Sequence, residues 1–308
     1  MRQPRRFHEM TDRQMATILV AGATGNLGGR IVQALIKRGA AVRAIVRTSS
    51  DPQKTDNLKQ QGVELVEVDL NDFASLTKAC AGVSCVVSAL QGLRDVLVDT
   101  QSKLLDAALA AGVPRFIPSD YATDFTKQAA GENRNFDLRK EFMAHIDAKP
   151  IAATSIMNGA FAEILFYGTP LLDFKNKQVG YWENADWRVD FTTMDNTAAF
   201  TAAAALDDST PRILRIASFQ LSPNELAKVA EEATHSPYSV VRLGSLEDLM
   251  AYNKRERAAN PKGEQEVYPR WQQSQYQQSM FTVQHETLDN DRYSDVQWTG
   301  PQEWLSRQ

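Results

Sequence analysis

The sequence predicts an α/β fold, a Rossmann-type doubly wound parallel sheet followed by a smaller α+β C-terminal substrate lobe. Three observations predict it. From Thr17 onward, short apolar β-branched runs alternate with helical stretches, which is typical of βαβ units. A glycine-rich turn joins the first run to an amphipathic helix. Several runs are apolar throughout, as strands covered by helices on both faces must be.

Each element has its own signal. Helices are expected over 27–38 and 95–111, because Gly39 and Gly112 follow them and glycine suits the left-handed residue past a helix end. An alanine-rich helix is expected over 197–206 and a further strand over 213–217. The first six strands are expected over 17–23, 41–47, 63–68, 84–89, 115–118 and 151–157.

The same pattern divides the chain into three parts. Residues 1–15 are arginine-rich without the apolar stretch of a secretory signal, and we interpret them as a flexible N-terminal extension. Residues 16–158 form the expected NAD(P)-binding Rossmann domain. Residues 159–308 form the substrate lobe, with the chain near 190–220 returning to the Rossmann domain. The glutamine-rich segment 271–280 is expected to be a solvated helix or loop.

Composition excludes several classes of protein. The 308 residues are 43% hydrophobic and carry a formal charge of -4, so no basic field favours nucleic acid. No apolar run approaches the roughly 18 residues that span a bilayer, so no membrane partner is expected. The two cysteines, Cys80 and Cys85, lack zinc-site spacing and are expected in the core. With few cysteines and no export signal, we expect a cytoplasmic protein.

The strongest local motif follows the first expected strand. Its first glycine permits a tight turn, its second lets amides approach a diphosphate, and its third allows close helix packing. The spacing is G-x-x-G-x-x-G, and its strand-turn-helix context makes a mere loop the weaker interpretation. The motif is Gly22-Ala23-Thr24-Gly25-Asn26-Leu27-Gly28, in which Gly22, Thr24, Gly25, Asn26, Leu27 and Gly28 are candidate cofactor-binding residues.

Other strand ends predict which dinucleotide is bound. Arg47 stands where NAD-specific sites often place an acid, so with Lys54 it favours the 2′-phosphate of NADP(H). The alternative is a solvated charge at the strand end. Asp69 is a candidate acceptor for the adenine amino group or, equally, a surface-turn residue. The end of the fourth strand is expected to line the cofactor with Ser88, Ala89 and Leu90.

Four segments carry a resemblance to a known family: 115–121 (RFIPSDY), 191–198 (FTTMDNTA), 221–226 (LSPNEL) and 290–296 (NDRYSDV). They resemble the atypical short-chain dehydrogenases of the isoflavone reductase-like and NmrA-like group over nearly the whole chain after residue 16, except about 253–284. Pro118 and Tyr121 are candidate cofactor contacts at the end of the fifth strand. Ser119 is expected to hydrogen-bond the cofactor or substrate or, equally, to cap a turn with Asp120. The ordinary Tyr-x-x-x-Lys pair is absent, which argues against a nucleotide-sugar epimerase-like enzyme.

The resemblance also implies a catalytic lysine on the helix after the Pro-Ser motif. Counted from Phe136, Arg139 takes the matching place and Lys140 falls one position later. One residue turns a helix by about 100°, so the two side chains diverge. Arginine stays protonated and is a poor acid, so Lys140 is the expected catalytic and nicotinamide-side residue. The alternative is that both are solvated charges and the usual chemistry is lost.

These features predict an NADPH-dependent reductase acting on a small apolar substrate, aromatic, enone or quinone-like. The alternative is an NmrA-like protein that senses NADP(H) without turnover and binds a regulatory protein partner. No histidine has ligand spacing or an assigned catalytic role. An aromatic set is expected to divide between the core and a substrate slot: Phe161, Phe166, Tyr167, Tyr181, Trp182 and Trp187.

Overall fold

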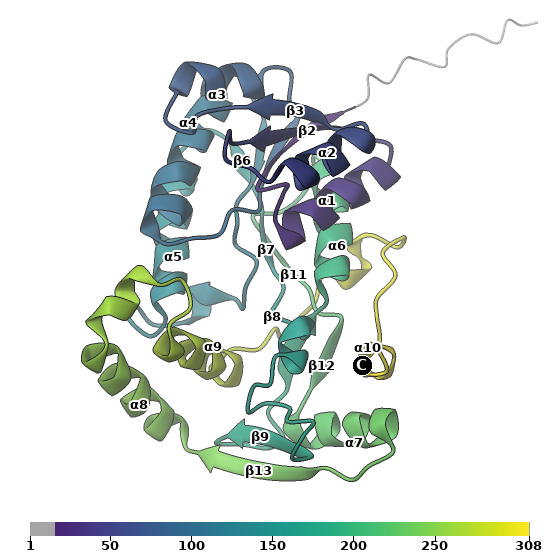
Figure 1. Ribbon diagram of the computed structural model, residues 1–308, viewed down its shortest axis with the longest axis vertical. Helices are drawn as coiled ribbons and strands as arrows, with labels where there is room; N and C mark the ends of the chain where they lie inside the picture. Colours follow the sequence, from purple (N-terminus) through teal and green to yellow (C-terminus); the bar gives the residue numbers. More distant parts are fainter. Residues whose placement is uncertain (1–15, 308) are drawn as a thin grey trace, which may run out of the picture.

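The computed structural model describes residues 16–307 and contains a six-stranded parallel sheet in the order β3-β2-β1-β4-β5-β6 (Figure 1). The expected extension 1–15 lies outside the described residues. Strand order reverses between β1 and β4, and doubly wound sheets bind ligands at the carboxyl ends of strands at such a point. The predicted fold class is confirmed. The strands are β1 Thr17–Ala21, β2 Ala41–Val46, β3 Glu64–Glu67, β4 Cys85–Ser88, β5 Arg115–Ile117 and β6 Ala152–Ala153.

Helices cover both faces of this sheet. Ile18 and Val20 of β1 face a core cluster shared with α1, α2 and α6, whereas Leu19 and Ala21 face one shared with α3, α4 and α5. Figure 1 shows the two groups on opposite sides. Burial on both faces explains why the strands are apolar throughout. The helices are α1 Asn26–Lys37, α2 Pro52–Gln60, α3 Phe73–Cys80, α4 Gln101–Ala110, α5 Arg134–Asp147 and α6 Met194–Leu206.

The expected strand 151–157 is two strands. β6 pairs with β5, but β7, Ser155–Met157, pairs in parallel with β11, Ile213–Arg215. The chain therefore changes partner at Thr154 while keeping its direction. The backbone N–H of Ser155 donates to the carbonyl of Arg212 at 2.8 Å. Tertiary pairing, which local sequence does not encode, sets this break.

The expected helix 95–111 also has two parts. Its first six residues form a π-helical turn, η1 Asp95–Thr100, before α4 begins. The wider turn brings the Gln101 amide onto the carbonyl of Leu97 at 2.6 Å. The oxygen of the same amide accepts from the backbone N–H of Ser119 at 3.0 Å. Such π turns often occur at functional sites, and this one supports the end of β5.

The second half of the chain packs around another core cluster, which includes Leu172, Val179, Phe191 and Leu226. β10 pairs in parallel with β8 and antiparallel with β12, while β9 pairs with β13. Figure 1 shows β9, β13 and α7 at the end of the molecule away from β3. These elements are β8 Ala160–Phe161, β9 Gln178–Trp182, β10 Val189–Thr192, β12 Phe219–Leu221, β13 Ser239–Gly244, α7 Pro223–Thr234, α8 Leu246–Ala259 and α10 Pro301–Leu305.

Helix α9, Arg270–Thr282, differs from the expectation for the glutamine-rich segment. It is not solvated: Gln272, Gln275 and Gln278 are at most 3% exposed. Each amide has a side-chain or backbone partner near α5 or α8, so burial leaves most of the polar atoms hydrogen-bonded. The composition of the segment predicted that its glutamines are exposed, because composition does not reveal which distant residues hydrogen-bond to them. Over residues 16–307, no helix is long and apolar enough to cross a membrane.

Candidate functional site

The glycine turn after β1 is closely packed. Gly22 has a φ of +88°, and a Cβ there would lie 2.6 Å from the carbonyl oxygen of Ala89. A Cβ on Gly28 would lie 2.1 Å from the oxygen of Gly22. The N–H of Gly25 donates to that same oxygen at 2.9 Å. Backbone therefore occupies the space that side chains would need at the first and third glycines.

The first turn of α1 offers hydrogen-bond donors. Gly25 is its N-cap residue, and no side chain in the described part of the chain caps the free N–H groups. Such a helix start attracts anions through its free amides and its dipole. A hollow of about 380 Å³ adjoins it, with walls from the turn, α1 and α2. Its lining includes Ala23, Thr24, Gly25, Asn26, Gly29 and Lys54. These residues fit a bound diphosphate.

Two cations are candidate phosphate ligands, and one of them, Lys54, lines this hollow. Arg47 follows β2 directly and is exposed, and its backbone N–H donates to Ser50 Oγ at 2.9 Å. Within residues 16–307, no hydrogen bond or ion pair engages the Arg47 guanidinium or the Lys54 ammonium. Both charges are therefore available to a phosphate, as the sequence expectation requires.

The carboxyl ends of the next strands are more constrained. Asp69 Oδ1 accepts from the N–H of Asn71 at 2.9 Å, so the surface-turn role is the one that the structure shows. Ser88 is fully buried, and its Oγ has no partner among the described residues. Ser119 Oγ donates to the carbonyl of Leu90 at 2.7 Å. Ser88, Ala89, Leu90, Pro118 and Ser119 therefore lie at neighbouring ends of β4 and β5.

Tyr121 and Asp120 are both buried in this region. The Tyr121 ring belongs to the core cluster on the α1 and α6 face, and burial raises the pKa of its phenol. Asp120 Oδ2 accepts from Ser155 Oγ at 2.5 Å, while Oδ1 has no partner in the described chain. Burial raises the pKa of Asp120, outweighing the hydrogen bond from Ser155 and the charge of Arg139. The sequence interpretation did not single out Asp120, although an acid after a buried strand was a usable signal.

Arg139 and Lys140 leave α5 in different directions. Lys140 Nζ donates to the carbonyl of Gln128 at 2.7 Å and lies 3.8 Å from Asp137 Oδ1. Arg139 Nη1 donates to the carbonyl of Asn135 at 3.1 Å. Its charge lowers the pKa of Asp120 at the end of β5, against the stronger effect of burial. The charge of Arg139 therefore acts on a residue at the carboxyl end of β5, whereas Lys140 contacts the turn that precedes α5.

A segment between α8 and α9 reaches the same edge. The Gln91 amide, just past β4, donates to the hydroxyl of Tyr268. Arg134 holds this segment, donating to the carbonyls of Glu266 at 2.8 Å and Val267 at 3.0 Å and stacking on Trp271 at 4.7 Å. Sequence reasoning missed Arg134, Gln91 and Tyr268, since their partners are far along the chain.

The expected aromatic slot does not form as one group. Tyr181 and Trp182 are on β9 and pack against the second core with Phe166 and Trp187, whereas Phe161 packs on the first. Tyr167 is 67% exposed. Most of the set therefore contributes to cores, which is the more common role of large aromatics.

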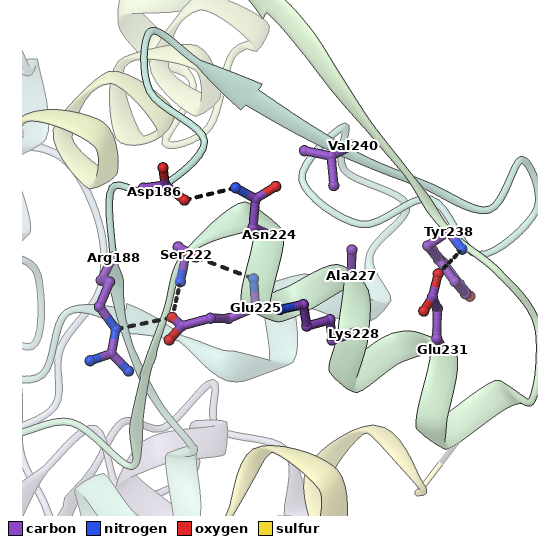
Figure 2. A pocket seen from close by; sticks show the side chains of 10 residues that line it. All are labelled: Asp186, Arg188, Ser222, Asn224, Glu225, Ala227, Lys228, Glu231, Tyr238 and Val240. Atoms are coloured by element: carbon purple, nitrogen blue, oxygen red, sulfur yellow. Dashed lines mark hydrogen bonds and ion pairs between the residues drawn. The ribbon is translucent and has the colours of Figure 1, made fainter.

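A larger hollow of about 600 Å³ lies at the start of α7 (Figure 2). Several of its charged groups are already engaged: Arg188 Nε donates to Glu225 at 3.0 Å, and Glu225 also accepts from the backbone N–H of Ser222 at 2.8 Å. Glu231 accepts from the N–H of Tyr238 at 2.9 Å. The elements that line it are not those of the glycine turn, so size alone does not make it the functional site. In the part of the chain described, no group of three metal-ligating side chains occurs.

Comparison with known proteins identifies the family. The profile of the NmrA-like family matches residues 14–256. The chain belongs to this family. It is 30% identical to isoflavone reductase homolog P3 of Arabidopsis thaliana over 249 residues, which cover 73% of this chain and 79% of the relative.

Solved structures agree with this assignment. A structure of AtPrR2 with NADP⁺ and (+)pinoresinol superposes with a TM-score of 0.77 at 26% identity, covering 96% of this chain and 99% of that one. An NADPH-dependent quinone oxidoreductase from Escherichia coli shares the fold, with a TM-score of 0.69, 20% identity and coverage of 94% and 98%. The predicted family is confirmed. The family match ends before Tyr268 and α9.

Proposed function

We propose that this NmrA-like protein is an NADPH-dependent reductase that reduces a small apolar substrate, aromatic, enone or quinone-like. The main support is the α1 start beside the glycine turn, which no side chain of residues 16–307 caps, together with Arg47 and Lys54, whose charges have no partner within the same range. The similarity to a protein solved with NADP⁺ supports the same cofactor. When bound, that cofactor supplies the hydride.

The residues of the site then have distinct roles. The amides of the glycine turn bind the diphosphate, and Arg47 with Lys54 binds the 2′-phosphate. Ser88, Ala89, Leu90, Pro118 and Ser119 border the nicotinamide half, where small side chains leave room for a ring. We also propose that Asp69 binds the adenine amino group and that Tyr121 lies beside the cofactor.

Lys140 is the proposed proton-transfer residue. It is the lysine on α5 beside the position of the family lysine, and its ammonium donates to a neutral carbonyl at 2.7 Å while the Asp137 carboxylate lies farther away at 3.8 Å. A change of rotamer would free it for a substrate oxygen. Lys140→Met should lower kcat for NADPH oxidation with quinones or enones about 100-fold while NADPH binding stays unchanged. Unchanged kcat would remove Lys140 from the mechanism.

The cofactor assignment has a direct test. NADPH should raise the melting temperature of the protein more than NADH at equal concentration. Arg47→Gln should weaken NADPH binding about tenfold and leave NADH binding unchanged, because only the phosphorylated ribose needs the guanidinium. Arg270→Gln, which removes an exposed charge from α9, is the matched control. Equal effects of both nucleotides on the wild-type protein would refute the role of Arg47.

A second candidate is an NADP(H)-sensing regulator that binds a protein partner without turnover. The specific observation is that Arg139, which stays charged, occupies the place of the family lysine. A screen of ketones, enones and quinones for NADPH oxidation separates the two candidates. Binding of NADPH without oxidation in any member of the panel would favour the regulator.

A further inference from the structure

We propose that Arg139 and Tyr268 form a recognition site for a negatively charged oxygen, a phenolate or carboxylate carried by an aromatic ring. This inference rests on the proposed function in one respect, namely that the same ligand is the reducible substrate. The site lies at the carboxyl edge of β4 and β5, and one of its two residues lies beyond the segment that matches the family.

The first support is the unpaired charge of Arg139. Other part-buried arginines have a carboxylate partner: Arg212 lies 2.6 Å from Asp147, and Arg215 lies 2.8 Å from Asp124. Arg139 has no carboxylate oxygen within 4.0 Å among residues 16–307. It makes one hydrogen bond, to the carbonyl of Asn135, and its buried Nε has no partner in that range. A part-buried cation left in this state is costly and favours an anionic ligand.

Neither Asp120 nor Glu141 neutralises this charge. Asp120 is fully buried, and its Oδ2 already accepts from Ser155. Because burial raises the pKa of Asp120, the neutral carboxylic acid is favoured over the carboxylate. Glu141, two residues after Arg139 on α5, pairs with Arg94 at 2.7 Å. The guanidinium of Arg139 therefore keeps its positive charge available at this edge.

The second support is the geometry of Tyr268. The amide of Gln91 donates to its hydroxyl oxygen, so the hydroxyl proton remains free to donate to a ligand. The Tyr268 side chain is 46% exposed although its hydroxyl is held, so its ring presents a flat apolar surface. Arg139 donates to the carbonyl of Asn135, and the Asn135 amide donates to the carbonyl of Val267 at 3.1 Å, the residue before Tyr268. The charge of Arg139 lowers the pKa of the Tyr268 phenol, although burial raises it overall. Two donors from different elements thus serve an acceptor that carries negative charge.

The third support is that Tyr268 is held in place. Arg134, only 8% exposed, donates to backbone carbonyls on both sides of Gln265, from Gly263 to Val267. Tyr276 adds a ring contact to Tyr268 at 6.2 Å. A side chain held at both its backbone and its hydroxyl loses little conformational freedom when it binds, which suits a recognition residue.

The experiment compares benzoate with benzamide, which has a similar shape and no charge. Each is titrated by calorimetry into the full chain, with and without saturating NADP⁺. We expect benzoate to bind about tenfold more tightly than benzamide. Arg139→Met should abolish this preference, and Arg139→Lys should keep part of it because the charge remains without the planar fork. Tyr268→Phe should weaken benzoate several-fold.

Arg94→Met is the matched control, because it removes one positive charge beside α5 without touching the proposed pair. It should leave the preference for benzoate unchanged. Equal binding of benzoate and benzamide to the wild-type protein, or a preference that survives in Arg139→Met, would overturn the inference. A benzoate preference in a protein that binds no NADPH would instead refute the proposed reductase and leave the anion site standing.

Discussion

The glycine turn and the contact between α5 and α9 are built in opposite ways. The turn is held by backbone contacts. Its seven residues approach one another and the end of β4 so closely that a Cβ on Gly22 or Gly28 would overlap backbone atoms. The α5–α9 contact is held by side chains: the Asn133 amide donates to the hydroxyl of Ser279, 146 residues away, at 3.0 Å. The comparison teaches that the phosphate end of this site is local in sequence, whereas the substrate end depends on distant partners.

The largest expected effect on stability tests the backbone contacts of the glycine turn. Gly28→Ala should lower the free energy of unfolding by about 3 kcal/mol, because its Cβ would overlap the oxygen of Gly22 and neither main chain can move freely. The affinity of this variant for NADPH should be lower as well. Urea unfolding followed by circular dichroism, with NADPH titration, measures both effects.

Gly29→Ala is the matched control on the same helix. Its Cβ would lie 3.4 Å from the carbonyl oxygen of Ala23, an ordinary contact. Alanine is favoured over glycine inside a helix by roughly 0.5–1 kcal/mol, so stability should hold or rise. Equal losses in the two variants would mean that the close approach at Gly28 is not what constrains the turn.

The next largest effect tests the side-chain contacts that hold the segment between α8 and α9. Arg134→Met should lower the free energy of unfolding by about 2 kcal/mol, because the carbonyls of Gly263, Glu266 and Val267 lose their charged donor. Protease cleavage within 260–268 should accelerate in the same variant.

Arg257→Met is the control for this contact. Arg257 also stacks on Trp271, at 5.0 Å, but its ion partner Glu264 is exposed. Its loss should therefore cost less than about 1 kcal/mol. If Arg257 proved as important as Arg134, stacking on Trp271 rather than the carbonyl contacts would hold the segment.

The smallest effect concerns His285, which follows α9 and packs against Asp190. Burial lowers the pKa of His285 below its usual 6.5, while Asp190 and Asp124 oppose the shift and Arg215 and Lys127 add to it. The folded state thus favours neutral imidazole, so its contribution is full above about pH 6.5 and declines as the pH falls toward the folded pKa.

Between about pH 8 and about pH 6, the free energy of unfolding should therefore fall because of this residue, by at most about 1 kcal/mol, since the unfolded histidine with its usual pKa of 6.5 binds the proton more readily than the folded one. His285→Gln should remove that part of the slope in urea unfolding. His235→Gln, at the end of α7, controls for the loss of one histidine. A slope that is the same in His285→Gln and the wild-type protein would contradict the predicted titration.

Much of the nucleotide half was predictable. The glycine turn, the apolar strands and the position of Arg47 each depend on residues within a few places of one another. Errors arose where a distant partner decided the outcome. β11 splits the strand expected over 151–157, and the buried partners of α9 cover a segment whose composition indicates solvent.

The sequence by itself determined the alternation of strand and helix, the glycine turn and the cations near it, because sterics and periodicity act over a few residues. Only the tertiary structure decided that Lys140 turns toward Gln128, that no carboxylate of the described chain pairs with Arg139, and that Tyr268 reaches Gln91. The physical reason is that a side chain's charge balance and hydrogen bonds depend on neighbours that folding brings from far along the chain.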